Sequence, residues 1–121
     1  MGLDQYAWKR KVDWADDYKS NNTYNEQIMY WRKHSKLQQW YSDTFDKDIG
    51  EVYLDKEHLD ELEKLTKEDN MPNSDGGFFY GHQFQDDPEH KELVNKDTLE
   101  FIKKARRAIS EGYDIVYECS W

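Results

Sequence analysis

The chain has 121 residues, with 17 Lys plus Arg against 26 Asp plus Glu, which gives a formal net charge of −9 at pH 7. This length predicts a single domain over residues 1–121, and the negative charge argues against direct binding to nucleic acid phosphates. Because there is one cysteine, Cys119, and no run approaches the roughly 18 apolar residues of a membrane span, we expect no internal disulfide, no cysteine-based zinc site and a cytosolic protein.

Aromatic side chains are unusually frequent. They make up 16% of the chain, whereas the hydrophobic share as a whole is only 36%. The core must therefore be built largely from rings, whose indole N–H and phenol O–H groups need hydrogen-bond partners. Pockets with polar rims are a natural result of such packing, and the aromatic surplus leaves room for a homodimer.

The first part of the chain predicts one strand, one loop and one long helix. Residues 3–12 carry bulky side chains in imperfect alternation and are expected to form a strand. Residues 13–25 are polar and rich in turn-forming residues, which is typical of a loop. From about residue 25 to residue 45 the pattern favours a helix, which ends before Gly50.

The middle of the chain predicts two short strands around a second helix. Residues 51–54 (EVYL) form the first of these strands, and Asp55 caps a helix that continues to about residue 68 with leucines along one face. Residues 77–81 (GFFYG) have glycines on both sides of an aromatic run and predict the other strand.

The last part of the chain predicts a third helix and a final strand. The helix begins near Asn95 or Asp97 and ends at Gly112, and residues 113–121 are rich in β-branched and aromatic residues. The alternating order of short strands and helices favours an α+β fold. We expect a small, mainly antiparallel sheet with about three helices packed mostly on one face.

The candidate functional residues concentrate in the segment 29–41 (MYWRKHSKLQQWY). On a helical wheel of about 100° per residue, Lys33 and His34 fall within about 60° of Leu37, on the same side as Tyr30. An aromatic ring beside a cation can hold a planar anionic ligand, because the ring stacks a base and the cation pairs with phosphate. The segment therefore predicts a ligand-binding surface made of Tyr30, Trp31, Arg32, Lys33, His34 and Trp40.

A purely structural interpretation of the same segment also stays open. Lys33 can lay its methylene groups over Trp40, while His34 is a partly buried hydrogen-bonding residue and Arg32 pairs with one of the many carboxylates. In that case the cations have no ligand and only stabilise the fold.

Other motifs give weaker signals. The glycines that flank residues 77–81 allow close approach of a ligand, which makes Phe79 and Gly81 further candidates. Residues 82–90 (HQFQDDPEH) gather histidines and acids, but their spacing matches no zinc or calcium motif, so no metal is expected. Residues 103–107 (KKARR) form a basic patch near a predicted helix C-terminus, where the helix dipole favours cations.

No nucleophile elbow or metalloprotease motif occurs, so neither catalytic residues nor a cofactor are predicted.

Four segments together resemble a family of short phage and prophage proteins. They are MGLDQY at residues 1–6, YWRKHSKLQQWY at residues 30–41, GFFYG at residues 77–81 and the final SW. Family members typically begin Met-Gly-Leu-Asp-Met-Tyr, carry a Tyr-Trp-Arg-Lys helix followed by a Trp, continue with Gly-Phe-Phe-Phe-Gly and end Ser-Ser-Trp. Among the departures from this pattern, His34 stands in place of a small residue and Cys119 in place of a serine. The matching residues are Gly2, Leu3, Asp4, Tyr6, Tyr30, Trp31, Arg32, Lys33, Trp40, Gly77, Phe78, Phe79, Gly81, Ser120 and Trp121.

The resemblance implies a phage origin and a location in the host cytoplasm, without a specific activity. Small accessory phage proteins that lack catalytic motifs often act against bacterial defences. The first expectation is a protein that sequesters a small anionic, nucleotide-like ligand, with Phe79 and Trp121 as possible walls of its pocket. One alternative is an acidic protein that inhibits a host DNA-binding defence protein by direct contact. The other is a hydrolase of a nucleotide signal that uses His34 or His82 as its acid or base.

Overall fold

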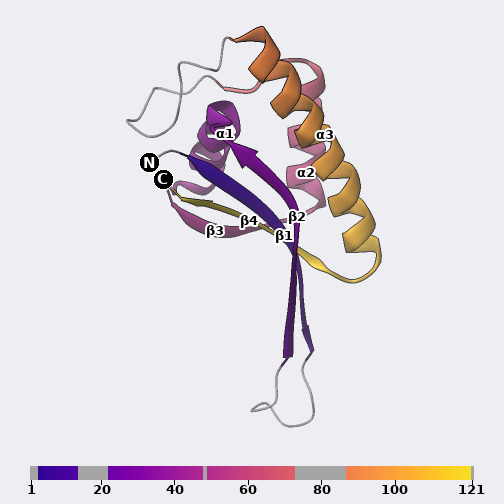
Figure 1. Cartoon of the computed structure of the whole chain (residues 1–121). Helices are drawn as coiled ribbons and strands as arrows, with labels where there is room; N and C mark the ends of the chain where they lie inside the picture. The colour runs from indigo at the N-terminus through magenta and orange to yellow at the C-terminus, as the bar shows by residue number, and fades with distance from the viewer. Residues whose placement is uncertain (1–2, 14–21, 48, 73–86, 121) are drawn as a thin grey trace.

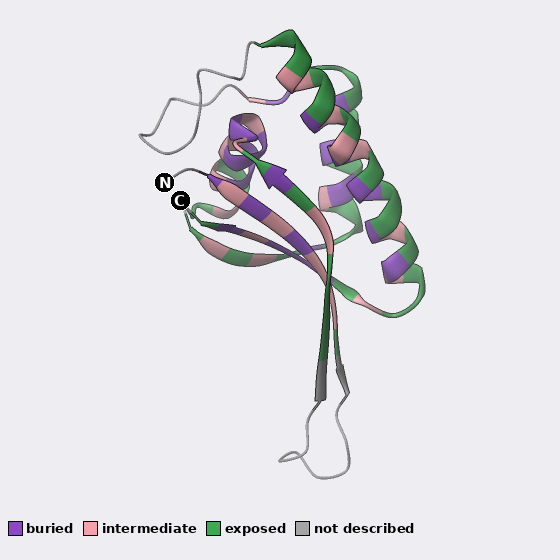
Figure 2. Ribbon diagram, in the orientation of Figure 1, coloured by how far each residue is buried: buried purple, intermediate pink, exposed green. Residues whose placement is uncertain are grey.

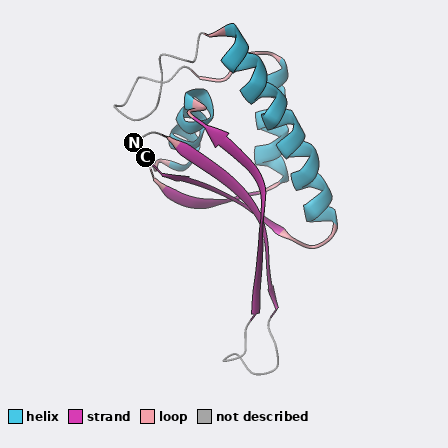
Figure 3. Ribbon diagram, in the orientation of Figure 1, coloured by secondary structure: helices cyan, strands magenta, loops and turns pink. Residues whose placement is uncertain are grey.

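The computed structural model describes residues 3–13, 22–47, 49–72 and 87–120. Within these ranges it contains four strands and three helices (Figures 1 and 3). Their order is β1 (Asp4–Asp13), β2 (Asn22–Arg32), α1 (Ser35–Phe45), β3 (Gly50–Leu54), α2 (Lys56–Lys67), α3 (Pro88–Ser110) and β4 (Asp114–Ser120).

The strands form one antiparallel sheet in the order β2-β1-β4-β3. The first and last strands therefore lie together at the centre, with Asp4 opposite Ser120, and β2 and β3 form the edges. Beyond Arg10 the strand β1 pairs only with β2, and the far ends of these two strands extend from the body as a ribbon (Figure 1). β2 also carries one extra residue, Ile28, where its register with β1 shifts.

The helices cover one face of this sheet, and the buried side chains between the two layers form one hydrophobic cluster (Figures 1 and 2). Strands contribute alternate residues to the cluster, as expected of a sheet with one covered face. Each helix contributes a buried stripe, purple in Figure 2. The predicted α+β class, with helices packed on one face of an antiparallel sheet, is confirmed. Central members of the cluster are Leu3, Ala7, Trp31, Leu37, Tyr41, Leu59, Leu62, Phe101, Ile102, Ile115 and Tyr117.

The predicted helix over residues 25–45 is wrong in its first part. Residues up to Arg32 belong to β2, and α1 begins only at Ser35. The predicted loop over residues 13–25 is wrong at its ends, because β1 includes Asp13 and β2 begins at Asn22, while residues 14–21 lie outside the described residues. The β2 segment contains two tyrosines, a tryptophan, a threonine and an isoleucine, which are residues that favour strands, and its pairing with β1 along the whole strand satisfies its backbone groups on that side. The helical wheel therefore does not apply to β2, where neighbouring residues point to opposite faces of the sheet.

Most of the other predicted elements are confirmed with small changes of boundary. The strand predicted at residues 51–54 begins one residue earlier, at Gly50, and the final strand spans Asp114–Ser120. α2 is capped by Asp55 as predicted, since the Asp55 carboxylate accepts from the His58 backbone N–H at 2.9 Å. His58 completes the cap, because its Nδ1 accepts from the Asp55 backbone N–H at 3.1 Å.

The start of α3 was predicted too late in the chain. The helix begins at Pro88, not near Asn95 or Asp97, which lie inside it. Asp87 caps it by accepting from the backbone N–H of Glu89 at 3.1 Å, and a proline in the first turn has no N–H that would need a partner. The strand predicted at residues 77–81 lies outside the described residues.

Candidate functional site

The corner between β2 and α1 is held by buried hydrogen bonds. The backbone of Lys33 turns with φ 58°, a left-handed conformation that is uncommon for a residue with a side chain. Lys33 donates its N–H to the Leu3 carbonyl at 2.9 Å. At the next position, the His34 N–H donates to Gln5 Oε1 at 2.9 Å, and Gln5 Nε2 donates to the His34 carbonyl at 3.0 Å. Gln5 is fully buried, so these bonds are shielded from water.

The same glutamine links the corner to the centre of the fold. Gln5 Nε2 also lies 3.0 Å from the hydroxyl of Tyr117 on β4, and that hydroxyl donates to Gln38 Oε1 on α1 at 2.9 Å. Tyr117 and Gln38 are buried like Gln5. A polar network inside the core therefore determines where β2 ends and where its last side chains are placed.

α3 packs against the end of β2 through Trp31. The indole N–H of Trp31 donates to Thr98 Oγ1 at 3.2 Å, and its ring meets Phe101 edge-on with 5.1 Å between centroids. Farther toward the start of α3, His90 Nε2 lies 3.2 Å from the Lys33 carbonyl. These contacts hold the first half of α3 beside the corner.

Between β2 and the first half of α3 lies a pocket of about 380 Å³, which we call the upper pocket. β2 and the corner supply the buried Trp31 and the exposed Tyr30 and Arg32, while α3 supplies apolar and polar side chains facing them. The Tyr30 hydroxyl donates to Asp4 Oδ1 at 2.6 Å, which fixes the ring beside the pocket. The lining residues are Tyr30, Trp31, Arg32, Lys33, His90, Leu93, Val94 and Asp97.

The arginines of the chain, all of them described, fall into two groups. Arg10 and Arg106 form ion pairs with carboxylates, at 3.0 Å and 2.7 Å. Arg32 and Arg107 form no ion pair with any residue that the structure describes. In a chain with 26 acidic residues, a guanidinium without a carboxylate is available to another anion. Arg32 lines the upper pocket, and Arg107 lines a second one.

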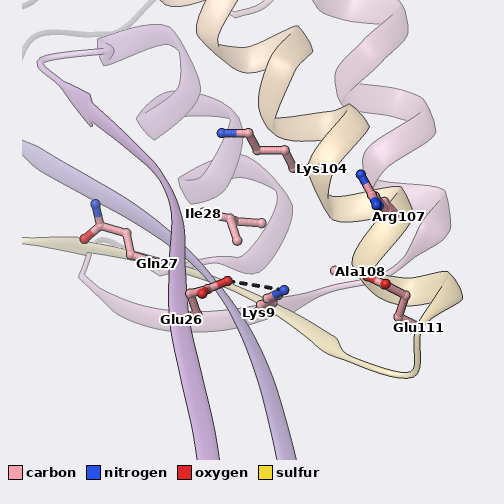
Figure 4. Close-up of a pocket in the computed structure, with 8 residues that line it drawn as sticks. All are labelled: Lys9, Glu26, Gln27, Ile28, Lys104, Arg107, Ala108 and Glu111. Atoms are coloured by element: carbon pink, nitrogen blue, oxygen red, sulfur yellow. Dashed lines mark ion pairs between the residues drawn. The ribbon is translucent and has the colours of Figure 1, made fainter.

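This second pocket, the lower pocket, has a volume of about 370 Å³ and lies between the middle of β2 and the last part of α3 (Figure 4). Its lining residues are Lys9, Glu26, Gln27, Ile28, Lys104, Arg107, Ala108 and Glu111. Lys104 and Arg107 belong to the basic patch predicted at residues 103–107.

His34 lies behind the upper pocket and does not line it. It borders a hollow of only about 10 Å³ and is 2% exposed. Its Nε2 and the hydroxyl of Ser35 have no hydrogen-bond partner in the described part of the chain. Burial lowers the pKa of His34 to about 3, and the nearby His90 and Lys36 act in the same direction. The imidazole is therefore neutral at pH 7.

The structure brings together four of the nine predicted site residues. Trp40 is not among the residues that line either pocket, because it is buried in α1, where its Nε1 donates to Glu61 Oε1 at 2.8 Å. The upper pocket contains Tyr30, Trp31, Arg32 and Lys33. The candidates Phe79, Gly81 and Trp121 lie outside the described residues.

Sequence reasoning missed the wall of the upper pocket that α3 supplies. Its residues are His90, Leu93, Val94 and Asp97, and the first three lie before the predicted start of the helix near Asn95. The signal for a helix was present, since an aspartate followed by a proline is a typical helix start. Nothing in the local sequence indicates that this turn of helix lies beside Lys33.

The described residues include no group of three or more His, Cys, Asp or Glu side chains arranged to hold a metal ion. Within the same ranges, no helix is long and apolar enough to span a membrane. No protein-family model, no curated protein and no solved structure matches the chain.

Proposed function

We propose that this chain is a phage accessory protein that binds and sequesters a small anionic, nucleotide-like ligand in the upper pocket. The observation that carries the proposal is Arg32, an arginine without a carboxylate partner among the described residues, at the rim of a pocket of about 380 Å³. The phage origin rests on the resemblance of the four sequence segments to phage and prophage proteins.

One end of the upper pocket suits a phosphate. The planar guanidinium of Arg32 can donate two parallel hydrogen bonds to phosphate oxygens, and Lys33 adds a second positive charge beside it. Because the backbone of Lys33 is anchored to the core, the backbone from which both cations project is held in place before a ligand arrives. Such pre-organisation reduces the entropy lost on binding.

The other end suits a flat, partly apolar group. Val94 and Trp31 are buried side chains that line the pocket, and Leu93 is 57% exposed at its rim. Covering Leu93 removes apolar surface from water, which favours binding by about 25 cal/mol for each Å² covered. The carboxylate of Asp97 can accept hydrogen bonds from an amino group or a hydroxyl of the ligand. A pocket of this volume is at the small end of ligand sites, the size range of a mononucleotide.

The environment of His34 favours binding over hydrolysis. A general acid or base works best when its pKa is near the operating pH. The pKa of His34 is lowered to about 3 by burial, and the side chain does not line the upper pocket. The hydrolase that was considered from the sequence would need another residue for this role, and its second candidate, His82, lies outside the described residues.

The proposal can be tested by thermal melting and tryptophan fluorescence with a panel of mononucleotides, cyclic nucleotides and ADP-ribose derivatives. We expect at least one compound to raise the melting temperature and to quench the fluorescence of Trp31. Arg32→Ala should weaken its binding by roughly 10- to 100-fold, because hydrogen bonds to a charged group contribute about 1.5–3 kcal/mol. Ligand released by heating should be recovered intact by chromatography.

Lys96→Ala is the matched control. Lys96 is an exposed cation on α3, next to Asp97 in sequence, but it does not line the upper pocket. Its replacement removes one positive charge from the same region and should leave the affinity within about twofold of wild type, since exposed charges are screened by salt. If no compound changes either signal, or if the two variants bind equally well, the proposed function is wrong.

A further inference from the structure

We propose that the lower pocket is a second anion site, independent of the upper pocket, which binds the phosphate of a small hydroxyl-bearing phosphomonoester. The two pockets lie along the same side of β2 but are well separated. Between Val94 and Ala108, which line one pocket each, α3 rises roughly 20 Å at 1.5 Å per residue. The contact of Trp31 with Thr98 and Phe101 lies between them. One small ligand molecule therefore cannot contact both pockets at once.

The charges of the lower pocket are not balanced within it. Lys9 lies 3.2 Å from Glu26, drawn as a dashed line in Figure 4, and this hydrogen bond lowers the pKa of Glu26. That carboxylate is thus already paired with a cation of its own. Lys104 and Arg107 form no ion pair with the described residues, and they face only one further acid in the pocket, Glu111.

Figure 4 shows how the two cations are presented. Lys104 extends from α3 toward β2, and Arg107 projects from the next turn of the same helix. Below them, Ile28 and Ala108 contribute small apolar side chains. A guanidinium and an ammonium from adjacent turns can bind one phosphate together, the first through its planar pair of donors and the second as a point charge.

The helix dipole does not by itself explain these cations. Cations are favoured in the last turns of any helix, and Arg106 occupies the same region of α3. Arg106 is nevertheless satisfied by acids of α2, with Asp60 at 2.7 Å and Glu63 at 2.8 Å. Arg107, one position later, lines the lower pocket and forms no ion pair with the residues that the structure describes.

The remaining lining residues indicate the rest of the ligand. None of the described residues that line the lower pocket is aromatic, whereas Tyr30 and Trp31 line the upper pocket. The carboxylate of Glu111, which forms no ion pair with the described residues, can accept hydrogen bonds from hydroxyl groups. These features favour a compact sugar phosphate over a nucleotide.

The test is calorimetric titration of the whole chain with ribose 5-phosphate and, separately, with inorganic phosphate. We expect ribose 5-phosphate to bind, Arg107→Ala to weaken it at least about tenfold, and Arg107→Lys to retain part of the affinity because one donor group remains. Lys103→Ala is the matched control, an exposed lysine of the same patch that does not line the pocket, and it should bind as wild type does. Thermal melting of each variant establishes that it is folded.

Arg32→Ala separates this proposal from the proposed function. It should leave binding of ribose 5-phosphate unchanged while it weakens binding of a nucleotide. The second site is disproved if ribose 5-phosphate does not bind at millimolar concentration, if Arg107→Ala and Lys103→Ala bind it equally, or if Arg32→Ala alone abolishes binding. Equal affinity for inorganic phosphate would overturn the assignment of a hydroxyl-bearing ligand.

Discussion

The substitution Gln5→Met tests whether the buried network holds the corner that carries Arg32 and Lys33. Methionine has nearly the length of glutamine but cannot replace its amide. The change removes three hydrogen bonds, two with the backbone of His34 at 2.9 Å and 3.0 Å and one with the Tyr117 hydroxyl at 3.0 Å. At about 1 kcal/mol for each bond, the free energy of unfolding should fall by about 3 kcal/mol. The loss is not smaller because the N–H of His34 stays buried without its partner, although the His34 carbonyl still accepts from the Gln38 N–H at 3.1 Å.

The measurement is urea unfolding followed by tryptophan fluorescence, with linear extrapolation to water. Gln39→Met is the control, since the amide of Gln39 makes an exposed hydrogen bond to Asp43 at 2.8 Å, and its loss should cost under about 0.5 kcal/mol. A cost below about 1 kcal/mol for Gln5→Met, or one equal to that of the control, would refute the role given to the network. If the role is correct, Gln5→Met should also weaken the binding of any ligand in the upper pocket, although Gln5 does not line that pocket.

Three further predictions concern a buried base, a buried thiol and a helix cap. Burial lowers the pKa of His34 from 6.5 to about 3, so the folded chain binds fewer protons than the unfolded chain between these values. Stability should thus fall as pH falls below about 6.5, by up to about 1.4 kcal/mol per pH unit, and His34→Gln should show a shallower slope in urea unfolding at several pH values. Equal slopes would contradict this. Cys119 is 1% exposed and burial raises its pKa. Labelling of this thiol by a thiol reagent, measured by mass spectrometry, should therefore be slow until denaturant is added. Fast labelling of the folded chain would show that the thiol is accessible. Asp55→Ala removes the cap of α2 and should lower the free energy of unfolding by about 1 kcal/mol, whereas an unchanged value would mean that the cap is dispensable.

Elements with local causes could be predicted from the sequence. α2 is encoded by its cap at Asp55 and by leucines at helical spacing, and the last strand by its run of β-branched and aromatic residues. These signals involve residues within a few positions of one another. The α+β class follows from them, because alternating short strands and helices have few ways to bury their apolar faces.

The end of β2 shows where such reasoning fails. The segment from Met29 to Trp40 has apolar residues that fit a helical wheel, yet its first part is a strand because β1 supplies a partner for its backbone. Pairing with β1 outweighs a weak local preference for helix. The left-handed turn at Lys33 then separates the strand from α1.

The sequence by itself determined the class of the fold, the position of α2 and the presence of rings and cations in one short segment. Only the tertiary structure decided that Tyr30, Trp31, Arg32 and Lys33 line a pocket whose other wall is α3, because His90 is 57 positions away from Lys33 along the chain. It also decided which arginines are paired with acids, since Arg106 and Arg107 are neighbours in sequence but face different elements. The physical reason is the same in both cases. Local spacing sets the direction of a side chain within its own helix or strand, whereas its partner comes from whatever other element packs against it.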